Sequence, residues 1–292
     1  MTDVYAAVES ILESEVATAQ EACRFLEVSR SAFYAWRQGA PTARAEGDLE
    51  LLPMVRMIFH RHRRRYGARR VARELQDRGH SCGRHRAAKL LKTQGLRAIQ
   101  PRSFKPRTTE SRHGLGYSPN LLLESDEPLR INQLWVGDIT YVPLVGGAFS
   151  YLAMLMDRFS RRLVGWALGE DMTESLTLRT LRTAIRSRSP GSALIHHTDR
   201  GGQYAGHEYR SVLRRADMRQ SMSRAGNCYD NAFMESCFGT FKTELEMTEY
   251  ENHRAALAAI RPYVAYYNLE RKHSAIGYLT PAQFETLNQP PK

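Results

Sequence analysis

The 292-residue chain is long enough for one large core with small appended parts, and its 42% hydrophobic and 25% charged residues are those of an ordinary soluble protein. No run approaches the roughly 18 apolar residues that a membrane span requires, and the acidic start MTDVYAAVES lacks the basic opening of a signal peptide. The four cysteines form no Cys-x-x-Cys pair, so a disulfide framework is not expected and a reducing cytoplasm is the predicted location.

The net charge of +11 is concentrated in one short segment of the chain. Residues 56–112 hold 18 Lys/Arg against three Asp/Glu, whereas residues 1–55 hold four against nine and residues 113–292 hold 20 against 19. So dense a basic block forms either a solvated surface or a binding surface for a polyanion. Nucleic acid is favoured over a membrane because no amphipathic anchor with large apolar residues accompanies the block.

Residues 1–44 are expected to form a helix-turn-helix-like segment. Ala22, Phe25 and Leu26 give a first short helix an apolar stripe, and Ser29 is placed to cap a second helix. A small helical hairpin that packs on another element fits the same pattern equally well.

Residues 45–98 are expected to form a basic helix-turn-helix domain that binds DNA. Apolar spacing marks a first helix ending at Gly79, and Ser81 is expected to cap a second helix that closes at Gly95. The second helix would meet DNA as a recognition helix does, and the arginine run before the first would contact phosphates. The candidate DNA-binding residues of this domain are Arg63, Arg64, Arg65, Arg69, Arg70, Arg84, Arg86 and Lys89.

Residues 99–130 are expected to form a basic linker. The segment holds four prolines and shows little periodicity, which is typical of an extended connection. Arg102 and Lys105 are its candidate DNA contacts.

Residues 131–245 alternate patterns that predict strands with patterns that predict helices. Strands are expected at 134–142, 149–157, 162–168, 193–197 and 219–223, with one helix before and one after the fourth strand, and a third from about 230 to 245. This order predicts an α/β, ribonuclease-H-like core, a five-stranded mixed sheet flanked by helices. Residues 246–292 are expected to add a C-terminal helix and tail, with Pro262 kinking or interrupting the helix.

Two aspartates occupy informative places in the predicted sheet. Asp138 lies in the middle of the first strand, where an ionised carboxylate is costly unless a hydrogen bond or a cation compensates it. It is therefore either a hydrogen-bonded structural residue or a metal ligand. Asp199 follows the fourth strand, and functional groups gather beyond the carboxyl ends of parallel strands. Gly201 and Gly202 then let the backbone turn sharply.

A third acid, Glu235, lies on the last predicted helix of the core. Met234 and Phe238 begin its buried stripe, while Glu235 and Lys242 share the neighbouring stripe, from which Lys242 could hold a phosphate. Alone, Glu235 would be read as a solvated surface residue. Sixty residues separate Asp138 from Asp199, and 35 separate Asp199 from Glu235.

Three oxygen donors with no cysteine beside them suit two Mg²⁺ or Mn²⁺ ions, which can assist an in-line phosphoryl displacement. With this spacing, the chain resembles the DDE transposases of the bacterial insertion-sequence-three family, in particular their OrfB subunit, whose core belongs to the integrase superfamily. The motifs that carry the resemblance are WVGDITYV, YLAMLMDRFSRRLVGWAL, HHTDRGGQY, SMSRAGNCYDNAFMESCFGTFKTEL and YYNLERKHSAIGYLTPAQF.

The resemblance implies roles for particular residues of this chain. It implies that Asp138, Asp199 and Glu235 form the catalytic, metal-binding triad and that Lys242 lies near terminal DNA. It also implies that Asn231 and His273 support or position the site. Of the adjacent His196 and His197, one is expected to face the core and the other to support the site, and His197 is the candidate for that role.

The function that the resemblance implies is a DNA transposase, which cuts the inverted repeats at the ends of an insertion sequence and transfers the strands to target DNA. The resemblance also implies a dimer or larger homo-oligomer and an upstream OrfA-type partner. The expected location is the bacterial cytoplasm, in association with the nucleoid and without contact with a membrane. Two alternatives stay open, a non-catalytic DNA-binding regulator and a hydrolytic ribonuclease-H-like nuclease.

Overall fold

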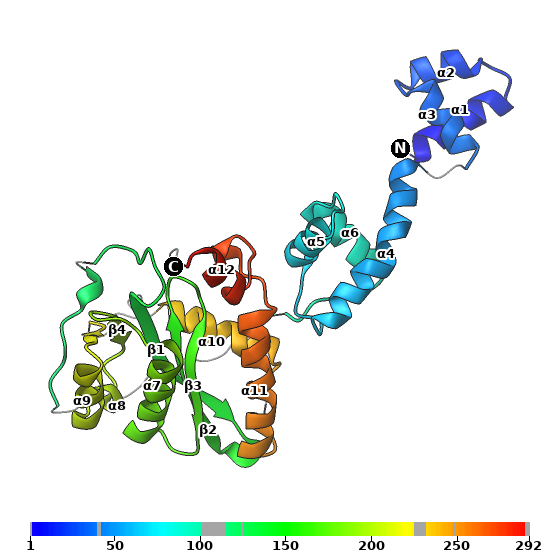
Figure 1. Ribbon diagram of the computed structural model, residues 1–292. Helices are drawn as coiled ribbons and strands as arrows, with labels where there is room; N and C mark the ends of the chain where they lie inside the picture. Colours follow the sequence, from blue (N-terminus) through cyan, green and yellow to red (C-terminus); the bar gives the residue numbers. More distant parts are fainter. Residues whose placement is uncertain are drawn as a thin grey trace.

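The computed structural model describes residues 2–39, 42–100, 115–123, 125–224, 232–247 and 249–289. These residues form an N-terminal unit of three helices, a second helical unit, and a larger part built on a sheet (Figure 1). Three of the predicted site residues, Arg102, Lys105 and Asn231, lie outside the described residues.

The N-terminal unit has a small apolar core of its own. It consists of α1 (Thr2–Glu13), α2 (Ala19–Phe25) and α3 (Arg30–Arg37), and Val8, Ala22 and Phe33 are buried among its helices. Ser29 caps α3, as predicted, because its side chain accepts a hydrogen bond from a backbone amide of the first turn. Helix α1 was not predicted, and it supplies Val8 to this core.

The α4–α6 unit contains the long helix α4 (Ala43–Arg61) and the shorter helices α5 (Ala68–Asp77) and α6 (Arg84–Thr93). Their apolar faces meet in one cluster, in which Ile58 and Leu75 are fully buried. The predicted cap of the last helix was wrong. Gly83 is its N-cap residue, and the carbonyl of Ser81 accepts a hydrogen bond from the guanidinium of Arg86, a residue of α6 itself.

The sheet has the strand order β3-β2-β1-β4-β5. The strands are β1 (Leu134–Pro143), β2 (Phe149–Asp157), β3 (Leu163–Gly169), β4 (Ile195–Thr198) and β5 (Arg219–Met222). The first three pair antiparallel, whereas β4 runs parallel to both β1 and β5. The predicted fold class, a five-stranded mixed sheet flanked by helices and preceded by small helical parts, is confirmed.

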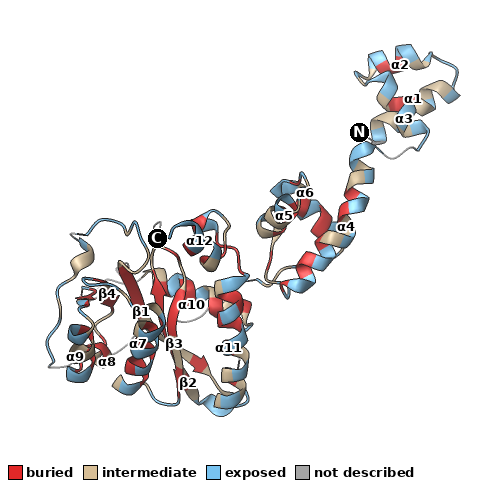
Figure 2. Ribbon diagram, in the orientation of Figure 1, coloured by how far each residue is buried: buried red, intermediate tan, exposed pale blue. Residues whose placement is uncertain are grey.

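Helices cover both faces of the sheet because successive β1 residues point to opposite sides. Trp135 packs into a cluster with α7 (Glu174–Arg188) and α9 (His207–Arg215), which follows the short α8 (Gly202–Ala205). Val136 packs into the cluster that includes α10 (Ala232–Glu244) and α11 (His253–Leu269). Figure 2 shows these buried strands between exposed outer helix faces.

Helix α11 contains Pro262 and continues through it as one helix, so the predicted interruption is not found. The short α12 (Pro281–Leu287) follows it. In the described part of the chain, no helix combines the length and the apolar character needed to cross a bilayer.

Part of the predicted linker lies along the edge of the sheet. The amide of Leu121 donates a hydrogen bond to the hydroxyl of Ser221 at 2.9 Å, and the amide of Met222 donates to the carbonyl of Pro119 at 3.3 Å. A short 3-10 turn (Leu121–Leu123) ends this stretch. Residues 115–123 therefore cover the β5 edge, which would otherwise offer unpaired backbone groups.

The close approach of α7 to β3 depends on Gly165. A Cβ atom at this position would lie 2.6 Å from the carbonyl oxygen of Thr180 and 2.9 Å from Cβ of Ala184.

We therefore expect Gly165→Ala to lower the free energy of unfolding by about 1–3 kcal/mol, because the added methyl group forces helix and strand apart. Urea denaturation measures the change. Gly191→Ala is the control, since nothing lies within 4 Å of its added Cβ, and equal losses in both variants would contradict the packing argument.

Candidate active site

The pairing of β1 with β4 brings the two predicted aspartates together. The parallel register sets Leu134 beside Ile195 and Val136 beside His197. Continued by two residues, this register places Asp199, the first residue after β4, beside Asp138. The pairing of two strands thus brings together two aspartates that 60 residues separate in the sequence.

Asp138 lies in an environment that opposes its ionisation. Burial raises the pKa of its carboxyl well above the ordinary value of 3.8, and the negative charges of Asp199 and Glu235 raise it further. The amide of Ile139, which donates to Oδ1 at 2.8 Å, and the charge of Lys242 act in the opposite direction. The structure therefore brings Asp138, Asp199, Glu235 and Lys242 within electrostatic reach of one another.

Asp199 is held by the turn that follows β4. Its Oδ1 accepts a hydrogen bond from the amide of Gly201 at 3.0 Å. A Cβ atom on Gly201 would lie 3.0 Å from the same oxygen, so a larger residue would crowd the carboxylate. Gly201 therefore both allows the turn and leaves room for the Asp199 carboxylate.

Helix α10 carries the third acid. Met234, Phe238 and Phe241 are buried on the side that packs over β1, as predicted, and Cys237 is buried with them. Glu235 is exposed beside this face. Burial lowers the pKa of Lys242, and the negative charge of Asp138 counteracts part of that effect.

The donor chemistry of the three acids suits a divalent cation, although their arrangement is not a ready-made metal site. Carboxylate oxygens are the ligands that Mg²⁺ and Mn²⁺ prefer, and the raised pKa of Asp138 indicates negative charge that a cation would neutralise. Within the described ranges, no group of three or more His, Cys, Asp or Glu side chains is positioned to hold a metal ion. The exposed Glu235 side chain would therefore have to turn toward the sheet.

The two predicted supporting histidines lie in different surroundings. His197 is buried, and its ring nitrogens lie 2.8 Å from the Ser221 hydroxyl and 3.1 Å from the Ser223 hydroxyl. The ring of His273 packs against Tyr267, 4.7 Å between centroids, and burial followed by the charge of Arg271 lowers its pKa to about 2. His273 is thus neutral, and it lines a pocket that does not include the acids.

The predicted DNA-binding residues of the α4–α6 unit divide into two groups. Those exposed to solvent are Arg63, Arg64, Arg69, Arg84 and Lys89. Arg65, Arg70 and Arg86 are partly buried and contact other residues of the chain. Arg86 forms an ion pair with Asp48 of α4 at 2.7 Å. Lys89 also reaches Asp48, at 3.2 Å, but stays largely exposed.

Arg65 and Arg70 join the α4–α6 unit to the end of α10. Arg65 lies over the rings of Tyr263 and Tyr266, 4.7 Å from each, and donates to the backbone carbonyl of Glu244 at 3.1 Å. Arg70 donates to the Glu244 carboxylate at 3.2 Å. These two arginines are therefore occupied by an interface inside the chain.

Glu244 is the centre of this interface, and the sequence did not single it out. Only 7% exposed, it accepts hydrogen bonds from Arg70, from Arg271 at 2.8 Å and from the Tyr263 hydroxyl at 2.8 Å. Burial opposes its ionisation, but the charges and hydrogen bonds of these neighbours outweigh burial and lower its pKa. A buried carboxylate with two guanidinium partners is stabilised in its charged form.

The same interface continues through other polar contacts. The hydroxyl of Tyr66 donates to the carbonyl of Glu270 at 3.1 Å and accepts from the amide of Lys272 at 2.8 Å. Lys272 also forms ion pairs with Asp77 and Glu74 of α5. The α4–α6 unit is therefore docked on the part of the chain that carries α10 and α11.

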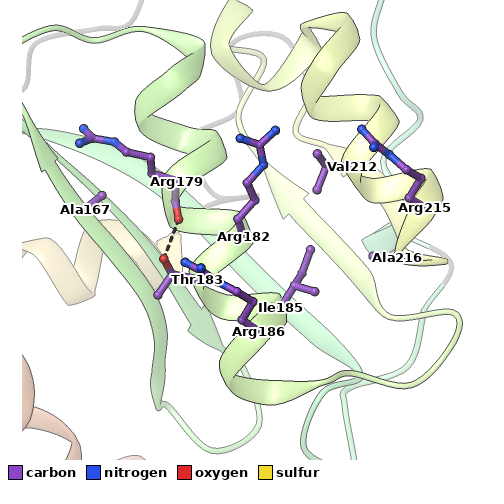
Figure 3. Close-up of a pocket in the computed structure, with 9 residues that line it drawn as sticks. All are labelled: Ala167, Arg179, Arg182, Thr183, Ile185, Arg186, Val212, Arg215 and Ala216. Atoms are coloured by element: carbon purple, nitrogen blue, oxygen red, sulfur yellow. Dashed lines mark hydrogen bonds between the residues drawn. The ribbon is translucent and has the colours of Figure 1, made fainter.

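A pocket of about 700 Å³ opens between α7 and α9, on the other face of the sheet (Figure 3). Its floor is apolar, formed in part by Ile185 and Val212, and four arginines surround it: Arg179, Arg182, Arg186 and Arg215. None of the three acids lines it. One of the arginines, Arg182, is neutralised by Glu208.

Comparison with known proteins places these parts in recognised families. Residues 128–228 and 216–281 match two families described as integrase core domain, and residues 46–104 match a family described as HTH-like domain.

Two relatives match the chain over most of its length. A 31 kDa protein of insertion element IS600 from Shigella sonnei is 42% identical over 264 residues, which cover 90% of this chain and 96% of that protein. Transposase InsF for insertion sequence IS3A from Escherichia coli is 38% identical over 270 residues, which cover 91% and 93% of the two chains. Among solved structures, a chain of the simian T-cell lymphotropic virus intasome is similar with a TM-score of 0.47 and 17% identity, covering 78% of this chain and 73% of that one.

We expect Glu244→Gln to destabilise the chain at neutral pH. Removing one partner from a buried ionic cluster typically costs about 3–5 kcal/mol, because the remaining charges lose their compensation. Since the folded pKa of Glu244 is lowered from 4.5, the stability that it contributes is present above that pH and is lost as the pH falls through the folded pKa. The deficit of the variant, measured by urea denaturation, should therefore shrink in acid. The exposed Glu249→Gln is the control, and a deficit independent of pH would contradict this account.

Proposed function

This chain belongs to the transposase family of insertion sequence IS3, and from that membership we propose that it cuts DNA strands at the ends of an insertion sequence and joins them to target DNA. The substrates would be the terminal inverted repeats and the target duplex. A DNA-binding regulator without catalysis and a purely hydrolytic nuclease are the alternatives that the experiments below separate.

One observation supports the proposal, namely that strand pairing sets Asp138 beside Asp199 and that the charge of Glu235 reaches Asp138. Carboxylates that lie close together in a partly buried site repel one another, and this repulsion lowers the stability of the free protein. Perturbed pKa values of this kind are typical of functional sites. The family resemblance implies that these acids support phosphoryl transfer.

Asp138, Asp199 and Glu235 would hold two Mg²⁺ or Mn²⁺ ions. When bound, the ions would stabilise the attacking and leaving oxygens of an in-line displacement at phosphorus. The oxygen donors and the excess negative charge fit this role, with Glu235 turning in from solvent to complete the ligand set.

The protein's own groups would orient the acids and the DNA. Backbone amides of Ile139 and Gly201 fix one oxygen of Asp138 and of Asp199, so both carboxylates are positioned before DNA arrives. Lys242 would bind a phosphate of the terminal DNA beside them. The exposed residues Arg63, Arg64, Arg69, Arg84 and Lys89 would hold DNA through its phosphates, which fix position and carry no sequence information.

Joining two ends requires that both be held at once. We therefore propose a dimer or larger assembly, with an OrfA-type protein as a further partner in end recognition. The place of action would be the nucleoid in the bacterial cytoplasm.

We expect Asp138→Asn, Asp199→Asn and Glu235→Gln each to lower cleavage of terminal-repeat DNA by about 10²–10³-fold, as the loss of a principal electrostatic group does. DNA binding should persist, because the phosphate contacts remain. Gel assays with Mg²⁺ would follow nicked and joined products separately. Asp126→Asn and Glu249→Gln, at exposed acids, are the matched controls.

The products discriminate among the alternatives. Cleavage that survives any one triad substitution would defeat the assignment of that residue. Nicked products that are never joined would favour the hydrolytic nuclease, and binding without any cleavage by the wild type would favour the regulator.

Metal binding can be tested without activity. In EDTA, we expect Asp138→Asn to be more stable than the wild type by on the order of 1 kcal/mol, because the substitution removes a crowded charge from a functional site. Mg²⁺ should raise the Tm of the wild type and leave that of Asp138→Asn unchanged, since a ligand stabilises only the state that binds it. An equal rise of Tm in both proteins would contradict a metal site at Asp138.

A further inference from the structure

A second pocket, of about 370 Å³, lies beside α10. Phe233, Ser236 and Thr240 line it at a spacing that places them on one side of the helix, whereas Glu235 and Lys242 lie on another. Arg161 comes to the pocket from the turn between β2 and β3, and His273 from the segment after α11. Sequence motifs from three distant parts of the chain thus meet at one place.

The turn that carries Arg161 is fixed by several hydrogen bonds. The amide of Arg161 donates to the carbonyl of Asp157 at 2.8 Å, and the amide of Ser160 donates to the Asp157 carboxylate at 3.0 Å. The Ser160 hydroxyl in turn donates to the buried Glu285. Arg161 itself has a φ of 63°, a left-handed conformation that a non-glycine residue adopts only at a cost in free energy.

In the described part of the chain, no carboxylate forms an ion pair with the guanidinium of Arg161. It lies 4.5 Å from the centre of the Phe233 ring, and the guanidinium of Arg158 lies 4.1 Å from the same ring. Arg158 pairs with Glu127, while the buried Nε of Arg161 has no hydrogen-bond partner among the residues that the structure describes. Burial, and then the positive charge of Arg158, lower the pKa of Arg161, although Tyr267, Glu127 and Asp157 act in the opposite direction.

The rest of the pocket offers hydrogen-bond donors. The hydroxyls of Ser236 and Thr240 form no hydrogen bond within the described ranges. Three arginines line the pocket, and two of them, Arg70 and Arg271, share the single carboxylate of Glu244, so Glu244 balances only one of the three positive charges. His273 is neutral and adds no charge to the pocket. A pocket with excess positive charge and free hydroxyls suits a tetrahedral anion with several acceptor oxygens.

We propose that this pocket binds one phosphate group of the DNA on which the chain acts, with Arg161 as the charged ligand and the hydroxyls of Ser236 and Thr240 as further donors. That the phosphate belongs to DNA rests on the proposed function. A phosphate held there would place a strand along the side of α10 away from Lys242. The helix that carries Glu235 would then be contacted by DNA on two sides.

The test is the salt dependence of DNA binding, measured by fluorescence anisotropy with a duplex of the terminal repeat. Each phosphate contact contributes about −0.9 to the slope of log K against log salt for duplex DNA. We expect Arg161→Gln to make the slope less negative by about one such contact and to weaken binding several-fold at low salt. Ser236→Ala should weaken binding less.

The matched control is Arg186→Gln, which removes an exposed arginine on the opposite face of the sheet. It should leave the slope unchanged. Thermal unfolding of each variant shows whether the fold is retained, and Arg161→Lys, which keeps the charge, should restore most of the slope if Arg161→Gln proves unstable.

A second arm identifies the source of the phosphate. Without DNA, chloride is exchanged for inorganic phosphate at constant ionic strength, and the Tm of wild type and Arg161→Gln are compared. A phosphate-dependent rise that is lost in the variant, together with an unchanged DNA slope, would assign the pocket to free phosphate and overturn the DNA proposal. No change in either arm would overturn the site altogether.

Failure of this inference is distinguishable from failure of the proposed function. Loss of cleavage in the triad variants, with an unchanged slope in Arg161→Gln, would leave the transposase assignment intact and reject only the proposal that the pocket binds a DNA phosphate. A wild-type chain that binds no DNA would reject the proposed function and the DNA proposal together, and the phosphate arm would then decide whether the pocket binds an anion.

Discussion

The parallel pairing of β1 with β4 is the constraint on which the rest of the site depends. It sets Val136 beside His197, and two residues further along it brings Asp138 and Asp199 to the same place. The cost is electrostatic, because burial and the neighbouring carboxylates raise the pKa of Asp138. The grouping of these acids lowers the stability of the fold, so stability does not explain it. The free energy lost in this way is what a divalent cation would recover on binding.

Helix α10 links this site to the rest of the chain through two glutamates with opposite surroundings. Glu235 is exposed near the sheet, while Glu244, nine residues later, is buried under Arg70 and Arg271. The α4–α6 unit therefore fixes the far end of the helix that carries Glu235. Under the proposed function, DNA bound by the exposed arginines of that unit would be bound by a part of the chain that is already joined to α10.

Local patterns in the sequence predict much of this structure. Short apolar runs located the five strands, and the spacing of Met234, Phe238 and Phe241 located the buried side of α10. Asp138 stood out because a carboxylate in a central strand requires an explanation, whereas Glu235 was singled out only by its spacing from Asp199 and by the family resemblance. Helix α4 was not predicted, because its charged and apolar residues are mixed around the helix with little separation.

The roles of single arginines could not be predicted, because they depend on contacts between distant parts of the chain. Arg63, Arg65 and Arg70 belong to the same basic run, yet only the last two reach Glu244, some 175 residues away. The most direct measurement of the central claim is an anomalous difference map from a crystal of the chain grown with Mn²⁺. The account predicts a peak within coordination distance of the Asp138 and Asp199 carboxylates and absent from Asp138→Asn. A fully ordered site without such a peak, at saturating Mn²⁺, would contradict it.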